Sequence, residues 1–285
     1  MRSLTVVLTI LIVAVLLSPA GAEEYFLSPD GDDDAAGTRE APWRTLERAA
    51  EAAEAGDSVT FLPGRYEGQL RPVNSGTAEE PIVFRSEPRL AARLTGSGDG
   101  SHAIVLRGNA HLRFEGLHID PDPDRGAWVH MRDGSNITFE DCRMENSRGG
   151  MPMHFEDSED IRVLHCVIQR HVGHNMFRLS NCTRVLLEGN TISRTGHSPF
   201  QLWPDHSNSR VVIRGNVFNA AWGRPFEHFG TEYVLFEHNI ITHAFNSGRS
   251  ASANAKFATT RSIFRFNRVF RNPHGSIHLY PFREV

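Results

Sequence analysis

The chain is poor in several residue types, and each shortage limits what the protein can be. Three cysteines in 285 residues are too few for a disulfide-stapled scaffold. Lys256 is the single lysine, so nearly all positive charge comes from arginine, and no basic block indicates nucleic-acid binding. One long apolar run exists, residues 5–17, and it is shorter than the roughly 20 residues of a membrane-spanning helix. The composition therefore favours a folded chain without a nucleic-acid or membrane partner.

Residues 1–22 have the pattern of a secretory signal peptide. Arg2 supplies a positive start, the apolar run follows, and Ala20-Gly21-Ala22 forms a small-residue cleavage site. We therefore predict an exported mature domain over residues 23–285, secreted or periplasmic, with no membrane contact after cleavage. An uncleaved membrane anchor is the alternative interpretation of the same residues.

One short pattern recurs seven times between residues 112 and 270, at intervals of 23 to 28 residues. An apolar residue stands three positions before and two positions after each member of a shared column. This ladder column consists of Leu117, Cys142, Cys166, Asn190, Asn216, Asn239 and Asn267. A fixed period of this length indicates stacked units that bury an apolar face only together. We predict that the asparagines point inward and hydrogen-bond along the stack. Cys142 and Cys166 would be close enough for a disulfide, although stacked thiols are the expected state.

The segment before the repeats is predicted to cover the open end of the stack. Residues 25–28 and 58–62 read as short strands. Between them, Leu46, Ala49, Ala50 and Ala53 share one face of a helix over residues 45–55 that ends at Gly56. An exposed sheet edge invites unwanted pairing, and an amphipathic helix at this place would block it. We assign residues 24–66 to this N-terminal cap.

The order of short motifs in the cap carries a resemblance to a known group of proteins. The motifs are SPDG at 28–31, Gly37-Thr38, Pro42-Trp43, Gly56-Asp57 and Pro63-Gly64-Arg65-Tyr66. This order resembles the entry segment of secreted right-handed parallel β-helix proteins of the pectate-lyase-like superfamily, and in particular polysaccharide lyase family 6, which includes chondroitinase-B-like and alginate lyases. The resemblance implies an all-β fold, a right-handed single-stranded parallel β-helix with a short capping helix. It also implies a lyase acting on an acidic, uronate-containing polysaccharide.

Alternation of side chains predicts one row of polar residues on the outward face of a sheet. This outward row reads Val105, His130, His154, Arg178, Gln201, Glu227, Lys256 and His278, and a parallel row and the loops add His174, His197, Trp203 and Arg224. An ordinary wet surface would also be polar, but it would be richer in acids than in histidine and tryptophan. In proteins with the resemblance above, the sugar chain lies along this face.

A uronate lyase needs a group that neutralises the carboxylate, a base for the C5 proton and an acid for the leaving oxygen. Arg178, Arg224 or a cation held at Glu227 could neutralise the carboxylate. Lys256 or His278 could be the base, with the other cation as the acid. Substrate-binding residues would then be His130, His154, His174, His197, Gln201, Trp203 and Arg224. An ion pair between Lys256 and Glu227 is an equally good interpretation of the two charges.

Two features leave the function open at this point. Glu227-His228-Phe229 lacks the Glu-x-Glu pair of the calcium-binding lyases, so no calcium site is carried over and no cofactor is assigned, although a divalent cation such as calcium is compatible. The alternatives are a non-catalytic carbohydrate-binding or envelope protein, a glycoside hydrolase and an epimerase. Residues 280–285 begin a turn and stop, which predicts either a piece of a longer protein or an open end that self-associates.

Overall fold

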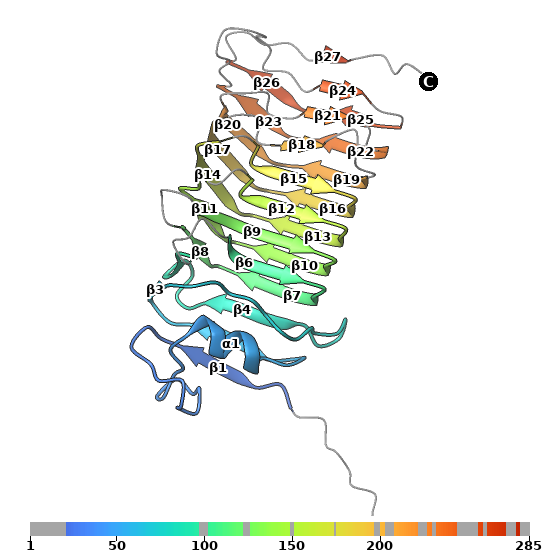
Figure 1. The fold of residues 1–285 in the computed structure, drawn as a ribbon. Coiled ribbons are helices and arrows are strands. Elements are labelled where there is room, and N and C mark those ends of the chain that lie inside the picture. The colour runs from blue at the N-terminus through green and yellow to red at the C-terminus, as the bar shows by residue number, and fades with distance from the viewer. Residues whose placement is uncertain are drawn as a thin grey trace, which may run out of the picture.

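A computed structural model describes residues 21–96, 102–121, 126–148, 151–173, 175–196, 200–202, 208–221, 227–229, 232–243, 256–258, 261–271 and 278–279. For residues 200–202, 220–221, 227–229, 256–258 and 278–279 only the backbone is described. The described chain forms an elongated solenoid of three parallel sheets, in which each turn from β6 onward contributes one strand to each sheet (Figure 1).

The first sheet has ten strands in chain order, all paired in parallel. They are β1 (Glu24–Leu27), β2 (Ser58–Phe61), β4 (Ile82–Ser86), β7 (Ala110–Glu115), β10 (Ser135–Glu140), β13 (Glu159–Leu164), β16 (Thr183–Glu188), β19 (Ser209–Arg214), β22 (Glu232–Glu237) and β25 (Ile263–Arg265). The second sheet has nine strands. They are β3 (Gly64–Tyr66), β5 (Ala92–Leu94), β8 (His118–Ile119), β11 (Arg143–Glu145), β14 (Val167–His171), β17 (Thr191–Thr195), β20 (Val217–Ala221), β23 (Ile240–Thr242) and β26 (Arg268–Phe270).

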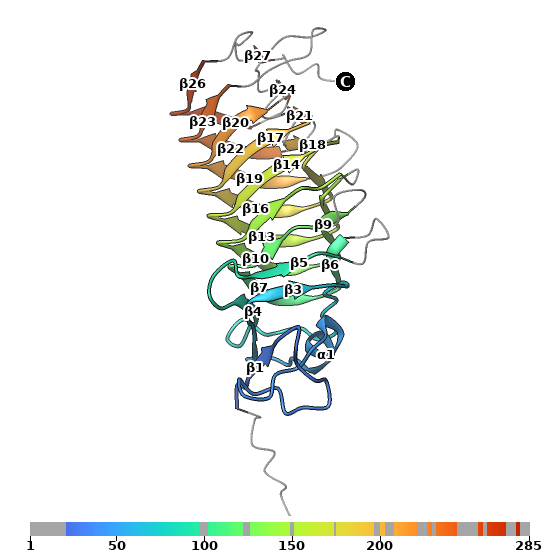
Figure 2. The same ribbon diagram turned by 90° about the vertical axis from the view of Figure 1, so that its left-hand side faces the viewer.

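The third sheet has eight strands and carries the predicted outward row. They are β6 (His102–Arg107), β9 (Ala127–Arg132), β12 (Met153–Glu156), β15 (Phe177–Ser180), β18 (Phe200–Leu202), β21 (Glu227–Phe229), β24 (Lys256–Ala258) and β27 (His278–Leu279). In the view turned by 90°, the strands of each sheet lie above one another in chain order from β1 upward (Figure 2). The predicted parallel β-helix is confirmed.

The helix of the N-terminal cap exists but is shorter than predicted. Helix α1 (Leu46–Ala52) lies beside β1 at one end of the solenoid (Figure 1) and begins at Thr45, whose side chain accepts a hydrogen bond from the Arg48 amide. It ends at Ala52 and not at Gly56, because Ala53 is extended and Asp57 Oδ2 accepts from the Glu54 amide at 2.8 Å. The carboxylate of Asp57 thus takes the backbone out of the helix one turn early.

A left-handed residue precedes each position of the ladder column at the corner between the first and second sheets. Gly189 and Gly215 occupy it with φ of 67° and 64°, immediately before Asn190 and Asn216. Glycine adopts this conformation without steric strain, which explains the Glu-Gly-Asn and Arg-Gly-Asn sequences of those turns. The sharp corner turns the asparagine side chain into the solenoid.

The ladder column is buried and hydrogen-bonded as predicted. Asn190, Asn216 and Asn239 have no exposed surface. The amide of each donates to Oδ1 of the next asparagine at 2.8–2.9 Å, which continues to Asn267. Cys142, Cys166 and Cys182 are free, buried thiols, so no disulfide joins the column. Beside the column, aromatic rings fill the interior: Phe114 stacks on Phe84 at 5.4 Å and on Phe139 at 4.9 Å between ring centroids.

Two predictions fall largely outside the described residues. The signal peptide, residues 1–22, overlaps the described chain only at its last two residues, and residues 280–285 at the far end lie outside it, so both predictions stay predictions. Among the helices that are described, none has the length and apolar character needed to cross a membrane.

Candidate functional site

The backbone of the third sheet brings the predicted outward row into register. Val105 pairs with His130, His130 with His154, and His154 with Arg178. The row continues through Gln201 and Glu227 to Lys256, and Lys256 pairs with His278. The inward neighbours Met131, Phe155 and Leu179 are fully buried, which fixes the opposite orientation for the row at this end of the sheet. Eight residues spread over 174 positions of sequence therefore occupy one register position across the sheet.

Three histidines form a stack at the N-terminal end of this row. The rings of His130 and His154 are parallel, with 4.9 Å between centroids and 3° between planes. His102 lies on the other side of His130 at 5.1 Å and tilted by 42°, and its Nε2 is 3.3 Å from the carbonyl oxygen of Met151. All three side chains are half-buried. We call these residues the histidine stack.

One carboxylate and several guanidinium groups surround the histidine stack. Glu156 Oε1 lies 3.1 Å from His154 Nε2, and Glu156 Oε2 lies 3.4 Å from His130 Nε2. Arg132 donates to the same Oε2 from Nε and Nη2, at 2.9 and 2.5 Å. The guanidinium of Arg107 lies along the His130 ring, with Nη2 3.1 Å from Nδ1. Arg178, in register with His154, adds a third guanidinium group, and Asp133 and Asp157 add negative charge near Arg132.

The surroundings of the stack keep its histidines uncharged near neutral pH. Burial lowers the pKa of His102 to about 4, helped by the positive charge of Arg107 and by His130. Burial also lowers the pKa of His154 to about 4, against the opposing pull of Glu156. For Glu156, burial acts to raise the pKa, but hydrogen bonds from Arg132 and the neighbouring histidines hold it below its ordinary value. The acid is therefore ionised while the imidazoles beside it are neutral.

Among the described side chains, two groups have ligand atoms close enough to hold a metal ion: His130, His154 and Glu156, and His118, Asp120 and Glu145. In both groups the carboxylates already face arginine. Arg132 holds Glu156, Arg93 Nη2 lies 2.8 Å from Asp120, and Arg143 Nε lies 3.2 Å from Glu145. Imidazole nitrogen is also a poor ligand for calcium, which prefers oxygen. These two groups of described side chains therefore do not fit a calcium site.

The predicted site residues divide into three sets in the structure. His130, His154 and Arg178 have described side chains that meet on the third sheet. Gln201, Glu227, Lys256 and His278 are placed by backbone register alone. His174, His197, Trp203 and Arg224 lie outside the described residues, so their predicted roles stay predictions.

Neither His102 nor Arg107 was among the predicted site residues. Strict alternation would turn His102 inward, since Val105 faces outward three positions later. The strand breaks the alternation, because Ala103 and Ile104 are both fully buried in succession. Arg107, in contrast, is in register with Arg132, so the two-residue spacing from Val105 could have identified it.

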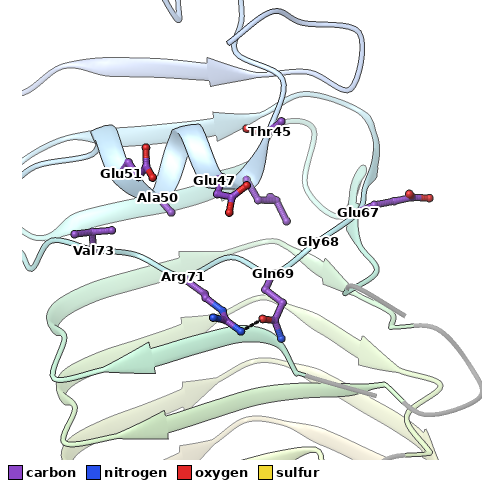
Figure 3. Close-up of a pocket in the computed structure, with 10 residues that line it drawn as sticks. Thr45, Glu47, Ala50, Glu51, Glu67, Gly68, Gln69, Arg71 and Val73 are labelled. Carbon is purple, nitrogen blue, oxygen red and sulfur yellow. Dashed lines mark hydrogen bonds between the residues drawn. The ribbon is translucent and has the colours of Figure 1, made fainter. Parts of the chain in front are cut away.

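A separate cavity of about 580 Å³ lies between α1 and the segment Glu67 to Val73 (Figure 3). Leu70 in this segment pairs with Ile104 of β6, so the cavity continues the third sheet beyond the histidine stack. Glu47, Glu51 and Glu67 line it, against one arginine, Arg71, which donates to Gln69. This acidic lining disfavours an anionic ligand, so the candidate site for an acidic sugar is the outward row.

The fold and the row agree with the relatives of this chain. A sequence profile described as "Pel9A-like, right handed beta helix region" matches residues 25–175, more than half of the chain, and one described as "Right handed beta helix region" matches residues 102–269. The chain therefore belongs to the Pel9A-like right-handed β-helix family. Its predicted membership of the pectate-lyase-like superfamily is confirmed at this level.

Individual relatives are distant. Pectate lyase PEL9 of Emericella nidulans is 28% identical over 167 residues, which are 53% of this chain and 40% of that enzyme. An alginate lyase from Paenibacillus sp. str. FPU-7 superposes with a TM-score of 0.60 at 13% identity, covering 92% of this chain and 99% of the lyase. Pectate lyase Pel9A superposes with 0.55 at 14%, covering 90% and 79%. The chain spans less than half the length of the curated relatives that it matches.

Proposed function

We propose that this protein binds an acidic polysaccharide along the outward row of the third sheet and cleaves it by β-elimination. The observation that carries the proposal is the charge of the row at its described end. Arg107, Arg132 and Arg178 lie there beside the imidazole rings of the histidine stack, and Arg132 is held by Glu156. Guanidinium groups in an outward row favour carboxylates, which arginine binds with paired hydrogen bonds.

The similarity to PEL9 supports the same substrate class, since that relative is a pectate lyase. Export, as predicted from residues 1–22, would place the protein where such polymers occur.

The proposed reaction needs three groups in a line. Arg178 pairs with the uronate carboxylate, so the charge that develops when the C5 proton leaves is stabilised. Lys256 or His278 takes that proton, the C4–O4 bond breaks, and a double bond forms between C4 and C5. The other cation gives its proton to the departing oxygen. Lys256 and His278 are partners in register on β24 and β27, at about the 4.8 Å spacing of neighbouring strands.

Lys256 must lose its proton to act as a base, and its ordinary pKa near 10.4 works against this. In the proposed site, positive charge on the neighbouring His278 or Arg224 lowers the pKa of Lys256. Glu227 acts in the opposite direction, since it is in register with Lys256 on β21. An ion pair between the two would keep the lysine protonated and favours the second candidate, a protein that binds the polymer without cutting it.

The experiment that separates these candidates incubates the chain from residue 23 onward with polygalacturonate, alginate and chondroitin sulfate. A lyase produces the ultraviolet absorbance of an unsaturated uronate along with new reducing ends. A glycoside hydrolase produces reducing ends without the absorbance. Binding of a polymer without either product assigns the protein to the non-catalytic class and refutes the proposed reaction.

A variant pair sharpens this assay. Lys256→Met removes the proposed base, and we expect a loss of activity of roughly a hundredfold or more, which is typical for removal of a general base. Arg268→Met removes one positive charge from the second sheet in the same turn, where Arg268 pairs with Ile240. This control should keep its activity.

A further inference from the structure

A cavity of about 180 Å³ lies at the edge of the second sheet, where its strands lead toward the third sheet. It is lined by Arg93, Asp120, Asn146, Arg148, Arg170 and Val172. Arg93 belongs to β5, Asp120 and Asn146 follow β8 and β11, and Arg170 belongs to β14. Four successive turns therefore build it, and none of these six residues belongs to the outward row.

Among the described lining residues, the arginines carry more positive charge than Asp120 can balance. The side chain of Asp120 is 5% exposed, and both of its oxygens are engaged: Oδ2 lies 2.8 Å from Arg93 Nη2, and Oδ1 accepts from Asn146 Nδ2 at 3.0 Å. Arg148 forms no ion pair within the described part of the chain. Arg170 Nη1 lies 3.9 Å from Glu145 Oε2, at the limit of an ion pair. Two of the three guanidinium groups are thus available to a ligand.

Glu145 does not cancel this surplus. Its Oε2 accepts from Gln169 Nε2 at 2.7 Å, and its Oε1 lies 2.9 Å from His118 Nε2 and 3.2 Å from Arg143 Nε. The shorter contacts on both oxygens come from residues outside the cavity lining. Glu145 is therefore held mainly by these three residues, and its contact with Arg170 is marginal.

Positive charge continues along the same edge. Arg194 stands one residue before Thr195 on β17, as Arg170 stands one residue before His171 on β14, and His171 pairs with Thr195. Both arginines are exposed. At the rim of the cavity, the side chain of Val172 is 63% exposed and offers an apolar surface. A ligand here meets guanidinium groups at successive turns and an apolar contact beside them.

We propose that this cavity is a second binding site for the acidic sugar chain, in which Arg148 and Arg170 hold one uronate carboxylate. The inference rests on the proposed function, because it takes the same polymer as the ligand. Its volume is below the 300–1,000 Å³ typical of sites for drug-sized molecules, so it suits one charged group and not a long oligomer. Guanidinium pairs match a carboxylate geometrically, and an apolar rim suits the carbon face of a sugar ring. The site strengthens binding of long chains that extend past the outward row.

The test compares the double variant Arg148→Gln/Arg170→Gln with a matched control, Arg162→Gln/Arg210→Gln. The control removes the same charge from exposed positions on β13 and β19 of the first sheet. Arg170 and Arg210 also share a left-handed backbone, with φ of 57° and 54°, so both doubles place glutamine under the same local strain. Dissociation constants are measured by calorimetry at low and moderate salt, for long polygalacturonate and alginate and for short oligomers of each.

We expect the cavity variant to bind the long polymer that the wild type binds best about fivefold to thirtyfold more weakly, from two exposed charge contacts. Its affinity should also depend less on salt, since fewer ion contacts remain to be screened. Binding and turnover of short oligomers should be unchanged, and the control should differ from the wild type by less than about twofold.

The other outcomes overturn the inference in distinct ways. Equal weakening by both doubles shows a general charge effect and refutes the cavity. Competition by inorganic phosphate with no change in polymer binding shows a small-anion site and also refutes it. If the wild type cleaves the polymer and the two double variants bind it equally well, the second binding site is refuted and the proposed lyase activity stands. If the cavity variant binds the polymer more weakly than the control but the wild type does not cleave it, the second binding site is supported and the lyase activity is refuted. If the wild type binds neither polymer, both proposals are refuted.

Discussion

The ladder column allows a direct prediction for Asn216→Ala. Asn216 Oδ1 accepts from both the backbone amide and Nδ2 of Asn190, each at 2.9 Å. Its own Nδ2 donates to the carbonyl oxygens of Leu187 and Arg214, each at 3.0 Å. Alanine removes all of these bonds at a position with no exposed surface. Water cannot replace them there.

The expected loss follows from the groups left without partners. Asn190 Nδ2 keeps the carbonyl oxygen of Val163 at 2.8 Å, but the backbone amide of Asn190 loses its acceptor. An unpaired buried polar group costs about 1–3 kcal/mol, and the small cavity and the weakened carbonyl contacts add to this. We expect the free energy of unfolding to fall by about 2–4 kcal/mol, a large part of the roughly 5–15 kcal/mol of a typical domain.

Urea unfolding followed by circular dichroism measures this change, with Asn219→Ala as the control. Asn219 lies on the neighbouring strand β20 and is half-exposed, so its replacement should change stability by less than about 0.5 kcal/mol. Asn216→Cys should fall between the two, because Cys166 in the same column donates to the carbonyl of Leu164 at 3.2 Å, as Asn216 does to that of Arg214. A loss for Asn216→Ala no larger than that for Asn219→Ala would refute the structural role of the column.

Three further predictions concern the histidine stack, the thiols and Arg132. In the unfolded chain His102 has its ordinary pKa of 6.5, whereas in the folded protein its pKa is about 4. The contribution of the neutral His102 to stability is therefore fully present above pH 6.5 and is lost as the pH falls toward 4. The free energy of unfolding falls by roughly 3 kcal/mol over this range because of His102. Unfolding curves between pH 7 and 4 test this, and a His102→Asn variant with an equally steep pH dependence would contradict it. Burial raises the pKa of Cys182 to about 11, and Cys142 and Cys166 are also buried. A thiol reagent should therefore label none of the three cysteines before unfolding and all of them afterwards. Rapid labelling of the native protein would contradict the described core. Arg132→Gln should weaken polymer binding and also raise the pKa of Glu156, which carboxylate titration by NMR can follow; an unchanged pKa would show that Arg132 does not control this acid.

The architecture was predictable because the solenoid repeats one packing problem in every turn. A single period relates the ladder column to the apolar positions on either side, so the register of Cys166, Asn190 and Asn216 followed from counting. The outward row followed from alternation, and the backbone pairs confirm its register from Val105 to His278. The exposed chemistry of a repeat protein is thus set by the same spacing as its core.

Where the chain departs from the repeat, the sequence was a weaker guide. Helix α1 ends at Ala52 because the Asp57 carboxylate accepts a hydrogen bond from the Glu54 amide, a contact that the apolar spacing of the helix does not reveal. His102 joins the stack through a break in alternation on β6 that no local pattern marks. The cavity of Arg148 and Arg170 depends on which acids are already engaged, and such pairing is a property of three-dimensional contacts.

The central claim is that the outward row of the third sheet holds an acidic sugar chain. A crystal structure of the Lys256→Met variant with a bound uronate oligomer tests it most directly. We expect sugar density along the third sheet, with carboxylates paired to Arg178 and Arg107 and a sugar ring beside the outer edge of His154. Density for the oligomer on the first sheet, or in the acidic cavity beside α1, with none over this row, would contradict it.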